Sequence, residues 1–215
     1  MVLFEEKSNY KIDDLLEIMR ILRSPEGCPW DREQTHTTIK KNIIEEAYEA
    51  ADAIGQNDDE ALCEELGDVL LQIIFHAQMA KETGEFDFDK VCDGICRKLI
   101  LRHPHVFGEV KADTAEKVLD NWAEIKKAEK GQADTTDVMN AVARSLPALM
   151  RGQKIAKAAI KGEILQPTQR QSGAEDKISA LIWEAVRTAV TEKLDAEEVF
   201  TDFLNDFISR GREEE

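Results

Sequence analysis

The stretch from residue 42 to residue 80 reads NIIEEAYEAADAIGQNDDEALCEELGDVLLQIIFHAQMA. It contains ten Asp or Glu residues and no Lys or Arg. Apolar residues recur at helical spacing on both sides of the turn sequence GQNDD, which predicts one helix over residues 37–54 and a second over residues 60–81. Because the connection is so short, we expect the two helices to lie antiparallel as neighbours.

Two pairs of acidic residues stand out in this predicted hairpin. Glu46 and Glu49 are three residues apart, as are Glu65 and Asp68, so each pair projects from one side of its helix and the pairs can converge. Converging carboxylates beside apolar residues repel one another unless they are protonated or bind a cation. Oxygen ligands without Cys or His suit Mg²⁺, with Mn²⁺ as a substitute. The alternative is a solvated acidic face, which explains most isolated acidic runs.

The predicted helix over residues 60–81 is apolar almost all round. Its polar positions form a narrow band, which we call the polar band: Glu65, Asp68, Gln72 and His76. A helix of this kind is normally buried, so the band is expected to face protein. His76, His103 and His105 show no zinc-site or nucleophile spacing, and we expect them to be structural.

The remaining chain is also predicted to be helical. Helical spacing or capping signals occur at residues 11–22, 89–102, 113–130, 146–161 and 177–210. The sequence RSPEGCPWD breaks the chain after the first of these helices, and residues 131–137 are a predicted linker. No segment alternates convincingly between apolar and polar residues, so the predicted fold class is all-α.

Composition excludes several function classes. The 215 residues carry a formal charge of −16, which disfavours binding to nucleic acid or to an anionic membrane. The start of the chain shows no signal-peptide pattern, and the apolar run over residues 69–80 is too short to span a bilayer. Four cysteines without a CxxC pair are expected to be reduced and mostly buried thiols of a cytoplasmic protein, with a zinc site as the lesser alternative.

Several segments together resemble one protein family. The acidic pattern reads Glu45-Glu46-x-x-Glu49 and then Glu65-x-x-Asp68. It is accompanied by GCPWDREQTH at 27–36, RHPHVFGEV at 102–110, NWAEIKKAEK at 121–130 and RSLPALMRGQKI at 144–155. Over roughly residues 10–155 the chain resembles the MazG-type nucleoside triphosphate pyrophosphohydrolases. The resemblance implies an all-α helical bundle completed by dimerisation, and Mg²⁺-dependent cleavage of a nucleoside triphosphate to the monophosphate and pyrophosphate.

The resemblance also implies roles for individual residues. Glu46, Glu49, Glu65 and Asp68 would be the metal ligands, with Glu45 and Glu46 catalytic and Glu45 orienting water or a second ion. The substrate would be held by six further residues: Asn42, Lys98, Arg102, Trp122, Lys126 and Trp30. Without the resemblance, the basic residues would be interpreted as an ordinary helix face. Trp30 and Trp122 would either stack on a base or fill the core.

Longer members of this family carry a second copy of the domain. We predict a MazG-like domain over residues 1–130, a linker over 131–143, and a shortened, degenerate second copy over 144–215. Only Glu184 stands where the second acidic motif would end, and Ala180 and Leu181 replace its opening acids. The chain stops before any equivalent of the basic positions, so activity is expected in the first half alone.

The sequence leaves two alternative functions open and predicts an assembly state. The chain could be a dUTP-type or phosphoribosyl-ATP-type pyrophosphohydrolase of the same superfamily, although GCPWD and RHPHVF argue against it. It could also be a non-catalytic, nucleotide-binding regulatory dimer. The hairpin has more apolar surface than its neighbours can cover, so we expect a homodimer whose contact includes the helix over residues 60–81.

Overall fold

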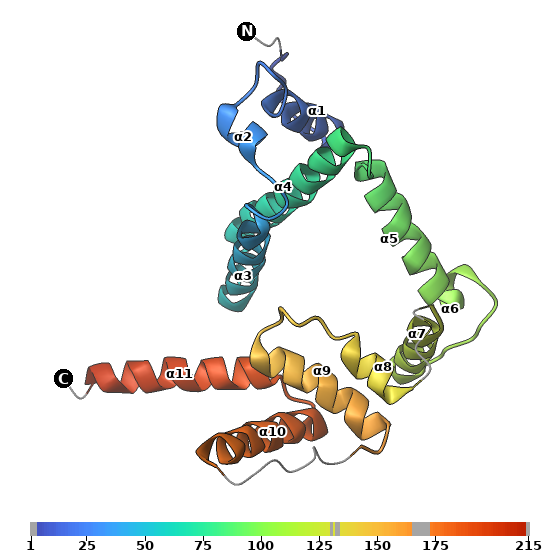
Figure 1. Ribbon diagram of the computed structural model, residues 1–215, viewed down its shortest axis with the longest axis vertical. Coiled ribbons are helices and arrows are strands. Elements are labelled where there is room, and N and C mark those ends of the chain that lie inside the picture. Colours follow the sequence, from blue (N-terminus) through green and yellow to red (C-terminus); the bar gives the residue numbers. More distant parts are fainter. Residues whose placement is uncertain (1–3, 130, 132–133, 165–172, 214–215) are drawn as a thin grey trace. The chain divides into compact units, whose positions relative to one another are not determined.

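The computed structural model describes residues 4–129, 131, 134–164 and 173–213 (Figure 1). Within these ranges there is no strand, which confirms the all-α prediction. The helices are α1 (Ile12–Leu22), α2 (Pro29–Glu33), α3 (Lys40–Gln56), α4 (Asp59–Thr83), α5 (Phe88–Arg102), α6 (Pro104–Phe107), α7 (Ala115–Glu129), α8 (Thr135–Asn140), α9 (Ala148–Lys161), α10 (Ala174–Glu192) and α11 (Ala196–Glu213).

The chain forms two compact units, Met1–Phe107 and Gly108–Glu215. The first unit contains α1–α6 and the second contains α7–α11. The domain predicted from the sequence extends to residue 130 and includes α7, because its boundary follows motifs rather than contacts. That domain division stays a prediction, and residues 130 and 132–133 of the predicted domain end and linker lie outside the described residues.

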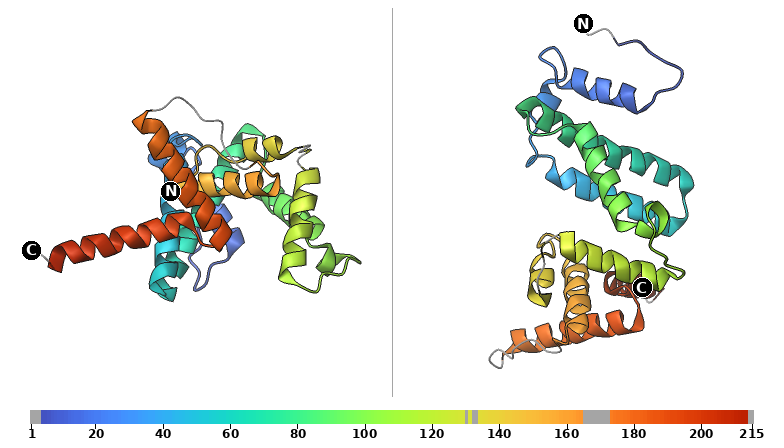
Figure 2. Two further views of the ribbon diagram at one scale, coloured as in Figure 1. Left: turned by 90° about the horizontal axis from the view of Figure 1, so that it is seen from below. Right: turned by 90° about the vertical axis from the view of Figure 1, so that its right-hand side faces the viewer.

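The predicted acidic hairpin is formed by α3 and α4, which pack together in the first unit (Figures 1 and 2). Asn57 ends α3 in the left-handed conformation, with φ 55° and ψ 39°, which Asn tolerates better than most residues. Asp58 begins α4, and its carboxylate accepts hydrogen bonds from the backbone N–H groups of Glu60 and Ala61 at 3.1 and 3.0 Å. The turn sequence therefore reverses the chain within two residues.

Three short or divided helices differ from the sequence prediction. The predicted break RSPEGCPWD contains the start of α2, because Pro29 stands in its first turn, where a missing N–H costs nothing. The predicted linker contains α8, where Asp134 and Asp137 form a reciprocal cap. The single segment predicted over residues 177–210 is two helices, separated at Lys193, which is left-handed with φ 60°.

Arg23 fastens the segment between α1 and α3 to α4. Its guanidinium donates to both carboxylate oxygens of Glu82 on α4, with a shortest N···O distance of 2.7 Å, and to the backbone carbonyls of Asp31 and Gln34. It also lies 5.4 Å from the centroid of the Phe75 ring. Gly27 allows the same segment to pass close to the end of α1, since a Cβ there would collide with the carbonyl oxygens of Ile21 and Leu22.

Each unit has its own apolar core. In the first, α1 and the residue before α3 pack on the C-terminal half of α4, and the buried members are Met19, Ile39, Ile74, Phe75 and Met79. In the second, α9 packs on α10 and the start of α11, and the buried members are Ala156, Val186, Ala189 and Ala196. The second core contains mostly small side chains, so it removes less apolar surface from water.

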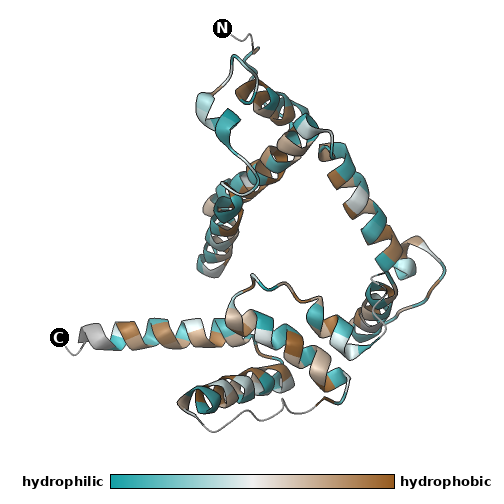
Figure 3. Cartoon of the chain, viewed as in Figure 1, coloured by the Kyte–Doolittle hydropathy of each residue, from teal (hydrophilic) through white to brown (hydrophobic). Residues whose placement is uncertain are grey.

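Several helices leave hydrophobic residues exposed. On α5 no described residue is buried, and Val91, Ile95 and Leu99 form an exposed stripe one turn apart. From Glu198 to Arg210 every residue of α11 is exposed, and hydrophobic positions recur along it (Figure 3). No helix of the described residues is long and apolar enough to cross a membrane.

The thiols are less buried than predicted. Cys28 and Cys92 are half-buried, whereas Cys63 and Cys96 are exposed, and all four are free. The prediction of mostly buried thiols was wrong: Cys63 lies on the N-terminal half of α4, whereas the first core packs on the C-terminal half, and no described residue of α5, which carries Cys92 and Cys96, is buried.

Candidate metal and nucleotide site

Three of the predicted metal ligands come together between α3 and α4. Glu46, Glu49 and Glu65 each offer a carboxylate oxygen, and these three oxygens lie within 4.8 Å of one another. Glu46 and Glu65 are half-buried, whereas Glu49 is exposed. The antiparallel turn at Asn57 places the two helix sides opposite each other, and this is how residues sixteen or more positions apart converge on one point.

The electrostatics of this cluster match its unanswered negative charge. Burial raises the pKa of Glu46, and the charges of Asp68 and Glu49 raise it further. Burial also raises the pKa of Glu65, followed by the charges of Glu49 and Asp68. Asp68 therefore lies close enough to act on both carboxylates, although it is not one of the three within 4.8 Å. No Lys or Arg is among the causes of either shift.

This donor set fits a divalent cation bound by oxygen. Carboxylates whose mutual repulsion raises their pKa values are stabilised in the ionised form when a cation neutralises them. All the donors are oxygens, which is the preference of Mg²⁺ and Mn²⁺ rather than of zinc or copper. The cluster can therefore hold a metal ion on one side and leave coordination positions open to water or phosphate on the other.

Asn42 and Glu45 lie on the same helix as Glu46. Asn42 is half-buried and stands one turn before Glu46, on the side of α3 that carries the cluster. Glu45 is exposed and precedes Glu46 directly, so it projects from a neighbouring part of the helix surface. The structure thus places both beside the carboxylates, with Asn42 toward the C-terminal half of α4.

The predicted basic residues of α5 are not brought to the carboxylates within the first unit. Lys98 is exposed and Arg102 is half-buried, one turn apart near the end of α5. Helix α5 follows the C-terminal end of α4 and runs away from the hairpin (Figure 1). Within the described residues of the first unit, neither of these two cations lies beside the acidic cluster.

The two tryptophans differ in their surroundings. Trp30, on α2, is 57% exposed, so within one chain its ring lies outside the core. Trp122, on α7 in the second unit, is half-buried, and the Lys126 ammonium group lies 4.9 Å from the centroid of its ring. This cation–π contact orients Lys126 next to an aromatic face.

The polar band continues beyond the carboxylates. Gln72 is 6% exposed, and its Oε1 atom has no hydrogen-bond partner among the described residues. One turn further, the Nδ1 atom of His76 lies 2.7 Å from the Nδ1 atom of His36, in the segment before α3. We did not single out His36 from the sequence. The four-residue spacing from Gln72 to His76 indicates that His76 lies on the polar band, but no local pattern indicates that His36 is its partner.

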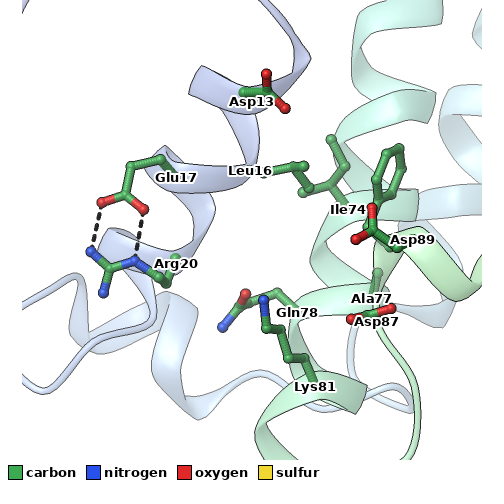
Figure 4. A pocket seen from close by; sticks show the side chains of 11 residues that line it. Asp13, Leu16, Glu17, Arg20, Ile74, Ala77, Gln78, Lys81, Asp87 and Asp89 are labelled. Atoms are coloured by element: carbon green, nitrogen blue, oxygen red, sulfur yellow. Dashed lines mark hydrogen bonds and ion pairs between the residues drawn. The ribbon is translucent and has the colours of Figure 1, made fainter.

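A separate hollow of about 200 Å³ lies between α1, α4 and the start of α5 (Figure 4). Leu16, Ile74 and Ala77 contribute its apolar part, and Glu17 forms an ion pair with Arg20 beside it at 2.6 Å. None of the predicted site residues lines this hollow. The carboxylate cluster is therefore separate from this hollow.

The chain is similar in sequence to known proteins. Residues 34–107 match the family model of the MazG nucleotide pyrophosphohydrolase domain. The chain is 44% identical over 199 residues to the nucleoside triphosphate pyrophosphohydrolase of Escherichia coli, covering 90% of this chain and 74% of that protein. It is 37% identical over 206 residues to the nucleoside triphosphate pyrophosphohydrolase/pyrophosphatase MazG of Thermotoga maritima, covering 93% and 75%. It is 32% identical over 204 residues to the nucleoside triphosphate pyrophosphohydrolase of Mycobacterium tuberculosis, covering 94% of this chain and 57% of that protein.

Proposed function

Because the chain belongs to the MazG family of nucleotide pyrophosphohydrolases, we propose that it hydrolyses nucleoside triphosphates to the nucleoside monophosphate and pyrophosphate, with its active site on the α3–α4 hairpin. The observation that carries the proposal is the cluster of Glu46, Glu49 and Glu65 oxygens within 4.8 Å, in a stretch, residues 42–80, that contains no Lys or Arg. Two ways of lowering the energy of such a site are protonation and cation binding, and the second also attracts a polyphosphate.

The proposed metal is Mg²⁺, held by Glu46, Glu49, Glu65 and Asp68. When bound, Mg²⁺ neutralises triphosphate charge and lowers the pKa of a bound water. The carboxylates would fix its position, and because burial and their neighbours' charges raise the pKa values of Glu46 and Glu65, cation binding would favour their ionised forms. Mn²⁺ prefers the same ligands and should substitute.

The other predicted residues have distinct proposed roles. Glu45 is exposed beside Glu46, where its carboxylate orients the attacking water by accepting a hydrogen bond. Asn42 holds the nucleotide one turn from the metal ligands, and the exposed ring of Trp30 stacks on the base. Lys98, Arg102 and Lys126 hold the triphosphate, whose negative charge grows on the leaving pyrophosphate, while the Trp122 ring supports Lys126.

A homodimer explains how the basic residues of α5 reach a carboxylate cluster. Val91, Ile95 and Leu99 are 36%, 45% and 47% exposed on the helix that carries Lys98 and Arg102. We propose that α5 of each copy packs along the α3–α4 hairpin of the other. This contact includes α4, covers the stripe, and pairs the positive end of α5 with the negative hairpin. The four free thiols fit a reducing compartment, so we place the enzyme in the cytoplasm.

The proposal is tested with purified full chain, a panel of nucleoside triphosphates and resolved products. The expected products are the monophosphate and pyrophosphate in equal amounts, only with a divalent cation present. Release of a nucleoside diphosphate and inorganic phosphate would contradict the proposed position of cleavage. The panel includes dUTP and phosphoribosyl-ATP, and exclusive use of either would assign the enzyme to another branch of the superfamily. Binding without turnover would support the regulatory alternative.

The dimer is tested in the same preparation. Light scattering should report about twice 24.3 kDa. Ile95→Lys places a charge in the centre of the proposed contact and should yield monomers with less activity, whereas Lys90→Glu, at the start of the same helix, should leave the mass unchanged. A fully active monomer would overturn the assembly, but not the assignment of the carboxylates.

A further inference from the structure

His36 and His76 share an unusually direct contact. Their Nδ1 atoms are 2.7 Å apart, and their ring planes are parallel within 3°. The ring centroids are 5.0 Å apart, which is the N···N distance plus the radius of each ring. The rings therefore meet edge to edge rather than face to face. This is the geometry of an N–H···N hydrogen bond, in which one Nδ1 donates and the other accepts.

The number of protons on the pair decides whether this bond exists. In the neutral pair one ring carries its proton on Nδ1 and the other on Nε2, so one donor meets one acceptor. One added proton converts the donor ring into an imidazolium, which still donates to the neutral partner. A second added proton leaves two N–H groups and two positive charges facing each other, and the bond is replaced by repulsion.

The bond joins two parts of the chain that the candidate site depends on. His36 precedes α3, whose first turns carry Asn42 and Glu46, and His76 lies on α4 two turns beyond Asp68. Between the histidine and the helix, Ile39 is 2% exposed in the core with Phe75 and Met79. We propose that His36 and His76 form a proton-controlled clasp that fixes the start of α3 against α4, and that opens when both rings are protonated.

The surroundings of the clasp favour such a response. Burial lowers the pKa of His76, and the nearby charge of His36 lowers it further. Among the described residues no carboxylate contributes to this shift. The helices packed around the pair carry charges of both signs: Lys40, Lys41 and Glu46 on α3, and Asp68, Lys81 and the Arg23-paired Glu82 on α4. A second proton on the pair meets the positive charge of the first imidazolium at the N···N distance of 2.7 Å.

The sign of the pH effect follows from the lowered pKa of His76. The unfolded chain binds this proton more readily than the folded chain, below the ordinary value of 6.5. The stabilisation by the clasp is fully present above that pH and is lost as the pH falls through the folded pKa. The other anchor, Arg23, holds the carbonyls of Asp31 and Gln34, so opening should loosen residues 34–42 without unfolding the first unit.

Nitrogen NMR on the full chain observes the clasp directly. At about pH 7.5 the Nδ1 nuclei of His36 and His76 should show a coupling across the hydrogen bond. The coupling should vanish as the pH falls and the second ring of the pair takes up its proton. Independent titration of the two rings without a coupling would overturn the proposal. This readout does not depend on the proposed enzymatic function.

Two variants at position 76 test whether the hydrogen bond to His36 is responsible for the pH response. In His76→Asn the amide oxygen accepts from His36 in either protonation state, so the clasp should stay closed at all pH values, whereas His76→Ala should leave it open. Hydrogen-exchange protection of residues 34–42 should fall about fivefold or more between about pH 7.5 and about pH 5 in the wild type. It should stay high in His76→Asn and low in His76→Ala. Identical protection in all three proteins would contradict the clasp.

The consequence for the site rests on the proposed function. In the wild type, acidification should raise KM for the nucleotide more than it lowers kcat, because Asn42 is displaced first. His76→Asn should suppress this rise, and His76→Ala should show a raised KM already at neutral pH. If exchange and NMR respond as expected but KM does not, the clasp stands and its coupling to the site is wrong. Absence of any turnover would count only against the proposed function.

Discussion

The two units each contain a helical hairpin closed by the same turn chemistry. In the first, Asn57 is left-handed and Asp58 accepts hydrogen bonds from the next backbone N–H groups. In the second, Lys193 is left-handed and Asp195 accepts from the N–H groups of Glu197 and Glu198 at 3.0 and 3.2 Å. The second turn is longer by one residue, Leu194, whose carbonyl accepts from the buried side chain of Gln153 at 2.6 Å.

The hairpins differ in what they carry. Counted back from the left-handed residue, Ile182 and Ala185 stand where Glu46 and Glu49 stand in the first hairpin, one residue beyond Leu181 and Glu184, the positions that the sequence motif pairs with them. Helices α3 and α4 pack together, whereas α11 is exposed beyond its first turn. In the described part of the chain, Glu46, Glu49 and Glu65 are the group of acids arranged to hold a metal. The candidate metal site therefore depends on a few acidic positions, since a similar turn between two helices also occurs where these acids are missing.

The largest expected effect comes from making the first hairpin resemble the second. Glu46→Gln or Asp68→Asn removes a charge from the proposed metal site while keeping the side-chain shape. We expect turnover to fall about 1,000-fold or more, because the metal and the water lose their positions together. Glu184→Gln, on α10, is the matched control and should retain wild-type activity. Near-normal rates in the first two variants would remove the metal site from the hairpin.

A smaller effect is expected from the basic residues of α5. Lys98→Ala and Arg102→Ala should each lower kcat/KM about 10- to 100-fold, because they act on triphosphate charge rather than on the metal. Lys157→Ala, an exposed lysine on α9, is the control and should change the rate less than twofold, within the scatter expected of a surface position. If all three variants behave alike in steady-state assays, the basic residues of α5 form an ordinary helix face.

Removing an acid from the cluster should raise the stability of the metal-free protein although it lowers activity. The raised pKa values of Glu46 and Glu65 mean that the folded chain favours their protonated forms. The stabilisation from protonation is fully present below the ordinary value of 4.5 and is lost as the pH rises through the folded pKa values. At neutral pH, Glu46→Gln should therefore raise the melting temperature of metal-free protein by a few degrees. Calorimetry in the presence of a chelator checks this, and a lower melting temperature would contradict the repulsion.

The smallest effect on chemistry should come from removing the second hairpin. A chain ending at Gly131 should keep measurable nucleoside triphosphate cleavage with reduced stability, since it retains the acidic hairpin, α5 and α7. Residues 132–215 alone should show none. Product analysis of both fragments beside the full chain is sufficient, and turnover by the second fragment would place an active site where the comparison of the hairpins finds none.

The acidic hairpin was predictable because its signals are local. Helical periodicity, the GQNDD turn and the three-residue spacing of the acids all lie within 39 residues, so antiparallel packing alone brings the acids together. The short helices α2 and α8 were not predictable, because Pro29 and Asp134 resemble a chain break until the following turn is formed. The His36–His76 contact spans forty residues and depends on how Ile39 packs, which no local pattern encodes.

The most direct test of the account is Mn²⁺ binding to the nucleotide-free full chain, followed by the loss of the free-ion signal in electron paramagnetic resonance. We expect saturable binding by the wild type and by Glu184→Gln, displacement of Mn²⁺ by Mg²⁺, and at least about tenfold weaker binding by Glu49→Gln and Glu65→Gln. Equal binding by all four proteins would place the metal elsewhere and contradict the claim that the first hairpin is the catalytic one.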